Sequence, residues 1–233
     1  MLTPDFRLPL FPLNVVLFPG MLLPLHIFEE RYKVMIQECL ASDRLFGVIL
    51  ARNRRAQAPN VADLDIHDIY GIGTTAQIKA VENLQDGRMN LITVGQERFV
   101  IKNIYSSAAD FLIGLVDPLL MVDDSPEVVE FMAQKLRPLV KQYIQHLGDA
   151  SGEDLSGTTL PVDPTDLAFL AGAAIQGPLP DKQQILSSDS LTKLIARTTT
   201  VVDREDQILV YMLRAYQVHQ QTQRLPFVDY SLN

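Results

Sequence analysis

The residue types that most often carry chemistry are few in this chain and are widely separated. One cysteine, Cys39, and four histidines are present, the histidines being His26, His67, His146 and His219. A single cysteine excludes an intrachain disulfide and any zinc site built from cysteines. Cys39 falls in an apolar pattern of helical spacing, so we interpret it as a buried structural thiol rather than a nucleophile. His26 adjoins an apolar run, which favours a hydrogen-bonded core or rim residue over a catalytic base.

One spacing would suit a metal ion. If residues 63–68 form an extended strand, Asp63, Asp65 and His67 share a face, because side chains alternate along a strand. Carboxylates and imidazoles are metal ligands, but a site needs further ligands, and the sequence offers no second cluster of them. We therefore favour an exposed acidic strand edge and predict no metal site.

Residues 70–76 read YGIGTTA and loosely match the Gly-x-Gly-x-x-Ala fingerprint of dinucleotide sites. That fingerprint follows a buried strand and opens a helix, whose N-terminus then holds the pyrophosphate. Here residues 76–82 alternate between apolar and polar, which predicts a strand instead. We expect the glycines to permit a close backbone approach or a bulge. No cofactor is predicted.

Charge and composition narrow the class of protein further. The chain of 233 residues has a net charge of −8, and residues 121–233 carry 15 Asp/Glu against 9 Lys/Arg, or −6 of that total. Such a field repels nucleic acid and anionic membranes. No apolar run is long enough to span a bilayer, and the N-terminus lacks the pattern of a secretion signal. With one cysteine, these features predict a cytoplasmic protein.

The elements that position these residues change character along the chain. Prolines at positions 9, 12, 19 and 24 predict extended chain and edge strands for the first part of the segment 8–50. Phe18-Pro19-Gly20 predicts a tight turn. A helix follows, because apolar residues recur at helical spacing, namely Phe28, Tyr32, Met35, Ile36, Cys39 and Leu40. Residues 46–51 return to a strand pattern.

Downstream, the spacing of apolar residues changes from alternation, which is typical of strands, to the spacing of helices. Strands are predicted up to Asp117-Pro118, with a hairpin turn at Asp86-Gly87. Helices are predicted after Ser125, with one ending at Gly148, one capped by Asp163, a short one at 181–186 and a long one from Ser188. The β-branched run 198–202 suggests a break in the last. The sequence thus predicts an α+β fold, with a β-rich lobe containing one helix at 1–120 and a helical lobe at 121–233.

Three runs of this sequence resemble a known family. LPLFPLNVVLFPGMLLPLHIFEERY at 8–32, followed by FGVIL at 46–50, is similar to the N-terminal substrate-binding domain of Lon ATP-dependent proteases. Similar domains also occur as stand-alone proteins and in cereblon. GTTAQIKAVENLQDGRMNLITVGQERFVI at 73–101 resembles the second half of the barrel in that domain, and LAFLAGAAIQGPLPDKQQIL at 167–186 resembles its helical lobe. Residues 217–233 match no part of the pattern.

The resemblance implies a PUA-like β pseudobarrel, a C-terminal α-helical bundle and a non-catalytic role in binding protein. We expect unfolded or damaged polypeptides as clients, with a role in protein quality control or as an adaptor and a protease or ATPase as partner. An RNA-binding module is the alternative, because PUA-like barrels often bind RNA and arginines cluster at 52–55. The acidic charge and the lack of a basic stripe with aromatic platforms weigh against RNA. The sequence leaves the oligomeric state open.

The candidate protein-binding patch surrounds the first turn and consists of Phe18, Met21, Leu22 and Leu23. A turn cannot bury all of its side chains, because its backbone polar groups need water or other partners. Four large apolar residues around one turn are therefore expected to leave apolar surface uncovered. The alternative is that the helical lobe covers them.

We predict that the purified protein hydrolyses neither ATP nor peptide. Lon proteases combine the domain with an ATPase module and a serine–lysine peptidase, and a phosphate loop requires Gly-x-x-x-x-Gly-Lys-Ser/Thr. None of the 12 glycines here is followed by lysine. Phosphate release and cleavage of a fluorescent peptide measure the two activities. Turnover that stays with the protein through successive chromatography steps would show the prediction to be wrong.

Overall fold

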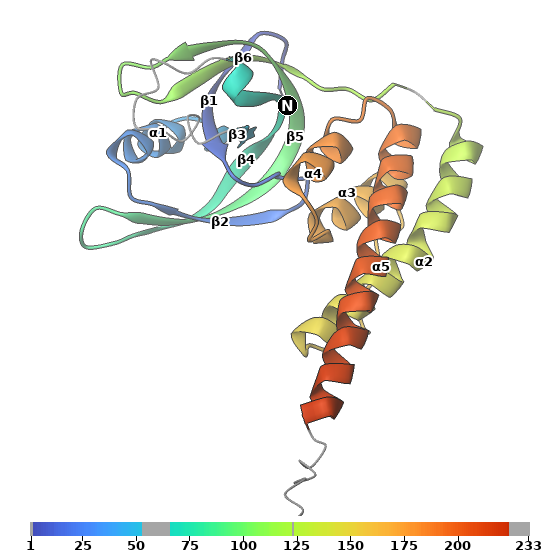
Figure 1. Ribbon diagram of the computed structural model, residues 1–233. Helices are drawn as coiled ribbons and strands as arrows, with labels where there is room; N and C mark the ends of the chain where they lie inside the picture. Colours follow the sequence, from blue (N-terminus) through green and yellow to red (C-terminus); the bar gives the residue numbers. More distant parts are fainter. Residues whose placement is uncertain (1, 53–65, 123, 224–233) are drawn as a thin grey trace, which may run out of the picture.

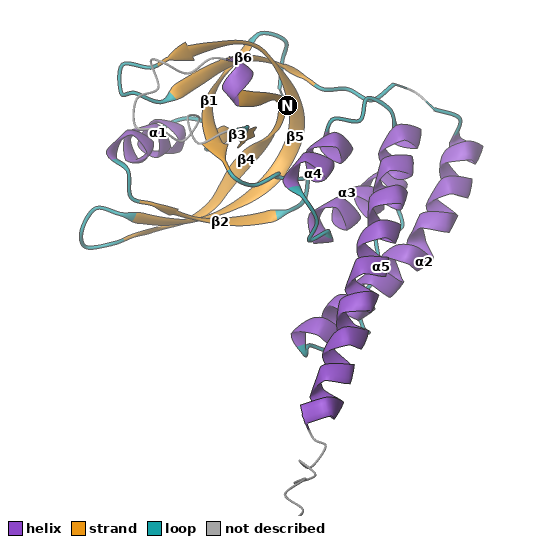
Figure 2. Cartoon of the chain, viewed as in Figure 1, coloured by secondary structure: helices purple, strands orange, loops and turns teal. Residues whose placement is uncertain are grey.

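A computed structural model describes residues 2–52, 66–122 and 124–223, which form a mixed α/β fold. The strands are β1 (Phe6–Leu13), β2 (Leu22–Ile27), β3 (Leu45–Ala51), β4 (Ile69–Asn83), β5 (Met89–Ser106) and β6 (Leu112–Pro118). The helices are α1 (Glu30–Leu40), α2 (Pro126–Ser151), α3 (Pro164–Ala174), α4 (Leu179–Leu186) and α5 (Leu191–Gln223). The change from strand to helix falls between Pro118 and Pro126, where the change of period predicts it (Figure 2).

The long strand β5 closes the sheet into a ring. One edge of β5 pairs with β4, while its other edge pairs first with β2 and then, from Phe99 to Ser106, with β6. β6 pairs in turn with β1, β1 runs parallel to β3, and β3 pairs with β4. The ring therefore contains β1, β3, β4, β5 and β6, and β2 extends it along the first half of β5 (Figure 1).

A tightly packed apolar cluster fills the ring. All five strands of the ring contribute to it, with Leu8, Ile49, Ile69, Phe99 and Val116 among its residues. Side chains from all strands of a closed sheet can meet only on its inner side. Gly73, from the segment that resembles a dinucleotide fingerprint, lies within β4, where a Cβ would come 2.4 Å from the carbonyl oxygen of Val48. The expected close backbone approach is confirmed for Gly73, whereas a Cβ at Gly71 would meet open space.

Helix α1 packs its apolar face against the strands. Tyr32, Met35, Ile36 and Cys39 are buried there, as their spacing predicts. Burial raises the pKa of the Cys39 thiol to about 12, which keeps it protonated and unreactive at neutral pH. The prediction that Phe28 belongs to this face is wrong: α1 begins at Glu30, and Phe28 precedes it with 61% of its surface exposed.

The helices after the sheet pack around α3. Asp163 caps α3 as predicted, its carboxylate accepting hydrogen bonds from the backbone N–H groups of Thr165 and Asp166. The predicted end of α2 at Gly148 is wrong, because the helix continues to Ser151 and Gly152 adopts the left-handed cap conformation.

Helix α5 is continuous over 33 residues, so the break suggested by its β-branched run is wrong. The hydroxyls of Thr198, Thr199 and Thr200 each donate to the carbonyl four residues earlier, and Thr198 and Val202 are buried. Tertiary packing therefore outweighs the weak intrinsic propensity of the run. Farther along the helix, Met212 is exposed.

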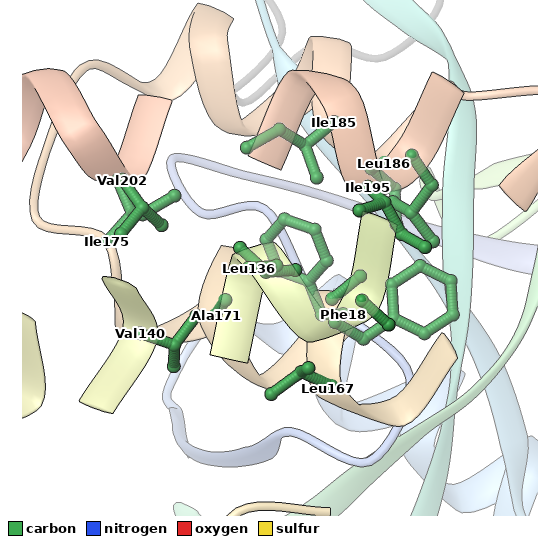
Figure 3. Close-up of a cluster of buried hydrophobic side chains, with 14 of the residues drawn as sticks. Phe18, Leu136, Val140, Leu167, Ala171, Ile175, Ile185, Leu186, Ile195 and Val202 are labelled. Atoms are coloured by element: carbon green, nitrogen blue, oxygen red, sulfur yellow. The ribbon is translucent and has the colours of Figure 1, made fainter. Parts of the chain in front are cut away.

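The connection between β1 and β2 enters the core of the helices. Val16 and Phe18 belong to the same buried cluster as Leu136, Leu167 and Ile185, which come from α2, α3 and α4 (Figure 3). The cluster also takes in Leu50 of β3. Strands and helices therefore share one hydrophobic core across their junction.

We predict that Phe18→Ala lowers the free energy of unfolding by about 3–5 kcal/mol, because truncating a fully buried phenylalanine leaves a cavity. Chemical denaturation followed by circular dichroism measures the change. The exposed Phe28 provides the control, and Phe28→Ala should change stability by less than about 0.5 kcal/mol. Equal effects from the two substitutions would contradict the role assigned to Phe18.

Candidate functional site

The turn at Phe18-Pro19-Gly20-Met21 is held against the sheet by its backbone. The N–H of Met21 donates to the carbonyl oxygen of Phe18 at 3.1 Å, and Gly20 has a φ of +77°, as a turn of this kind requires. Gly20 also donates to Gly95 of β5, and Gly95 donates to Met21, both at 2.9 Å. A Cβ at Gly95 would lie 2.2 Å from the carbonyl oxygen of Phe18, so only glycine permits this contact.

The four residues of the candidate patch differ in burial and do not form one exposed surface. Phe18 and Leu23 are buried, so these two residues of the patch contribute no exposed surface, as the alternative of coverage by other elements predicts. The helices cover Phe18, and the alternation of side chains along β2 turns Leu23 toward the core. Leu22 points to the opposite side, with 64% of its surface exposed, and Met21 is half-buried.

Two grooves flank the turn. The first, which we call the α3 groove, has a volume of about 320 Å³ and runs between the turn and α3; its residues are Pro19, Gly20, Met21, Pro161, Asp166, Phe169, Leu170 and Ala173. The second, the linker groove, has a volume of about 490 Å³ and follows the connection from β6 to α2; its residues are Leu2, Pro19, Gln96, Glu97, Arg98, Pro118, Leu119, Leu120, Met121 and Phe169. Pro19 and Phe169 line both grooves and separate them.

The linker groove contains apolar residues that the sequence reasoning missed. The N–H of Leu119 donates to the carbonyl oxygen of Arg98 at 2.9 Å, which fixes the linker beside β5. Leu120 follows with 76% of its surface exposed, and Met121 is half-buried. An apolar run directly after Asp117-Pro118, outside any periodic element, was the signal available in the sequence.

Arg98 stabilises the ridge that Pro19 and Phe169 form between the two grooves. Its side chain is buried, and Nη1 donates to the carbonyl oxygens of Leu186 at 2.7 Å and Ser188 at 2.6 Å, where α4 ends. The guanidinium also lies over the ring of Phe169, 5.4 Å from its centre. Burial lowers the pKa of Arg98 to about 10, so the group remains charged at neutral pH. A strand, a helix end and the ridge aromatic are thereby held together.

Two of the histidines make structural pairs. His26 bonds through Nδ1 to the Asn90 side chain at 2.8 Å, and His146 bonds to Asp206 at 2.6 Å, joining α2 to α5. His67 lies in a short 3₁₀ helix, Ile66–Asp68, rather than in the strand expected there. Its two suggested metal partners, Asp63 and Asp65, lie outside the described residues.

Arg52 is the described member of the arginine cluster. Its guanidinium carbon lies 4.1 Å from the centre of the Tyr70 ring, and its Nε donates a hydrogen bond to the carbonyl oxygen of Ile69. Its neighbours at 53–55 lie outside the described residues. Over the described part of the chain, no group of three or more His, Cys, Asp or Glu side chains is placed to hold a metal ion, and no helix is both long and apolar enough to cross a membrane.

A family comparison agrees with this arrangement. The family of the ATP-dependent protease La (LON) substrate-binding domain matches residues 7–204. The chain belongs to this family. The resemblance carried by the three sequence runs is therefore confirmed.

The relatives that match this chain are longer proteins. It is 26% identical over 205 residues to the Lon protease of Anaeromyxobacter dehalogenans and 26% identical over 204 residues to Lon protease 2 of Myxococcus xanthus. Each alignment covers 87% of this chain but only 24% of the protease. The chain thus spans about a quarter of the length of these relatives.

Two solved structures of Lon domains share the fold. The crystal structure of a Lon N-terminal domain protein from Xanthomonas campestris matches with a TM-score of 0.56 and 22% identity, covering 82% of this chain and 96% of that one. The N-terminal domain of the Mycobacterium avium complex Lon protease matches with a TM-score of 0.63 and 18% identity, covering 85% and 98%. These likenesses support the mixed α/β fold.

Proposed function

We propose that this protein binds exposed apolar segments of unfolded or damaged polypeptides and that the α3 and linker grooves receive them. The observation that carries the proposal is the pair of apolar grooves on either side of the Pro19–Phe169 ridge. Membership of a family named for substrate binding supports it. The role is non-catalytic, since binding of this kind needs apolar surface rather than a nucleophile or a general base.

The chemistry of the groove walls suits varied clients. Met21 lines the α3 groove, while Met121 and Leu120 line the linker groove. Methionine and leucine side chains repack at low cost, so a surface made of them accepts different apolar sequences. Arg98 and Phe169 keep the ridge in place beneath them. An extended client segment lying across the ridge would place apolar side chains on both sides of it.

The wider role proposed is in protein quality control or as an adaptor. The relatives that carry this domain are named Lon proteases, so a separate protease or ATPase is the partner we propose. We also propose a cytoplasmic location. The chain is proposed to divide into a PUA-like lobe at 1–120 and a helical bundle at 121–233. No observation on the described residues favours RNA as the ligand.

We predict that Leu120→Ser and Met21→Ser each weaken binding of a denatured protein by about tenfold, because a leucine or methionine buried on binding contributes roughly 1.5–3 kcal/mol. Fluorescence anisotropy with a labelled, reduced and carboxymethylated client measures the dissociation constant. Phe28→Ser is the matched control for Leu120→Ser, because Phe28 is also exposed but lies outside both grooves.

The variant Leu22→Ser separates the grooves from the neighbouring face of β2. Leu22 is exposed but lines neither groove, so its substitution should leave the dissociation constant within about twofold of the original. Loss of binding in Leu22→Ser with normal binding in Leu120→Ser would move the site onto β2. Normal binding in both groove variants would reject the grooves as the site.

A further inference from the structure

The α3 groove carries one charged side chain on an otherwise apolar wall. Asp166, Phe169, Leu170 and Ala173 line the groove from α3, and Met21 lines it from the turn. Residues three, four and seven apart share one face of a helix, so the four residues of α3 form a stripe. Asp166 stands at the N-terminal end of that stripe. Within the described residues, the groove therefore offers a continuous apolar surface that ends at a carboxylate.

The carboxylate of Asp166 is available to a ligand. The side chain is exposed, and in the part of the chain that the structure describes no hydrogen bond or ion pair reaches its carboxylate; only its backbone N–H is bonded, to Asp163. Arg137 donates instead to the carbonyl oxygens of Pro161 at 2.7 Å and Val162 at 3.1 Å, and it does not line the groove. The Asp166 carboxylate is thus free to pair with a cation that enters the groove.

The N-terminus of α3 does not cancel the negative charge at this end of the groove. A helix N-terminus carries roughly half a positive charge, and the cap residue Asp163 already accepts hydrogen bonds from the N–H groups of Thr165 and Asp166. Two carboxylates, the helix end and the guanidinium of Arg137 together sum to about −0.5 charge. A cation is therefore attracted to this position and an anion is repelled from it.

We propose that the α3 groove binds a lysine or arginine of the client segment, with the aliphatic stem along Met21 and Leu170 and the charged group on the Asp166 carboxylate. Lysine and arginine bury an apolar stem while their charged head stays at the surface, which is the shape and chemistry that this groove offers. The head donates charge-assisted hydrogen bonds to the carboxylate. The inference rests on the proposed client binding and names the class of segment that the grooves select.

The linker groove receives the apolar part of the same segment. Its charged groups are engaged within the chain: Glu97 accepts a hydrogen bond from the N–H of Leu2 at 2.9 Å, and Arg98 donates to the end of α4. Leu120 is the exposed side chain that remains for an apolar contact. The net charge of −8 on the whole chain also favours a cationic client over an acidic one. The selected segment thus carries a basic residue on one side of the ridge and apolar residues on the other.

A thermodynamic cycle between the protein and a synthetic client tests the contact with Asp166. Two fluorescein-labelled peptides of alternating leucine and serine carry either lysine or norleucine at the centre, since norleucine keeps the stem and lacks the charge. Fluorescence anisotropy gives their dissociation constants, and the norleucine constant divided by the lysine constant is the lysine preference. The lysine preference of the unchanged chain should exceed that of Asp166→Asn by about threefold, because an exposed ion pair contributes modestly.

Two further variants separate this contact from the overall charge. Asp166→Glu keeps a carboxylate and should retain most of the lysine preference. Glu130→Gln removes an exposed carboxylate of α2 that lies outside both grooves, and it should leave the lysine preference unchanged. An equal loss of preference in Glu130→Gln would assign the effect to the overall charge and overturn the inference.

Met21→Ser distinguishes failure of this inference from failure of the proposed client binding. If the lysine preference is the same in the unchanged chain and in Asp166→Asn while Met21→Ser weakens both peptides, the contact with Asp166 is overturned and the groove remains the client site. If Met21→Ser leaves the binding of both peptides unchanged, the α3 groove is rejected as the client site and this inference is rejected with it.

Discussion

The insertion of Phe18 into the helical core is the contact on which the rest of this structure depends. A residue from the connection between two strands is covered by helices from the other half of the chain, so the ring and the helices cannot pack independently. The ring of Phe18 lies 6.3 Å from that of Phe169, the aromatic residue of the ridge. With Phe18 fixed below, the following Pro19 is held at the surface. The same insertion that closes the core therefore creates the two grooves.

The grooves combine a rigid base with adaptable walls. Arg98 joins β5 to the end of α4 and lies over Phe169, while the hydroxyl of Thr74 donates to the carbonyl oxygen of Leu17 at 2.6 Å and fixes the chain leading into the turn. Met21, which is half-buried, and Leu120, which is exposed, line the grooves with unbranched or singly branched side chains. A binder of unfolded segments needs that combination, because the base limits the entropy lost on binding while the walls accept different side chains.

Local patterns in the sequence predict much of the fold, and long-range packing accounts for the errors. The turn at Pro19-Gly20, the buried thiol of Cys39 and the cap at Asp163 each follow from neighbouring residues, and all three are found. Phe18 was misjudged because nothing near it in the sequence reveals that helices beyond residue 125 cover it. Leu120 was overlooked since it belongs to no periodic element. Helix α5 runs on through its threonines because Thr198 and Val202 are buried, and this tertiary packing outweighs the weak helix propensity of the run.

The central claim is that clients bind in the two grooves. Methyl NMR of the protein labelled at its methionines tests it most directly, because these residues lie separately in the grooves, in the core and toward the far end of α5. Met21 and Met121 line the two grooves, Met35 is buried on the inner face of α1, and Met212 is exposed toward the far end of α5. Titration with a denatured client should shift the methyl signals of Met21 and Met121 and leave those of Met35 and Met212 unchanged. A shift at Met212 alone, or no shift at either groove methionine when the client is bound, would contradict binding in the grooves.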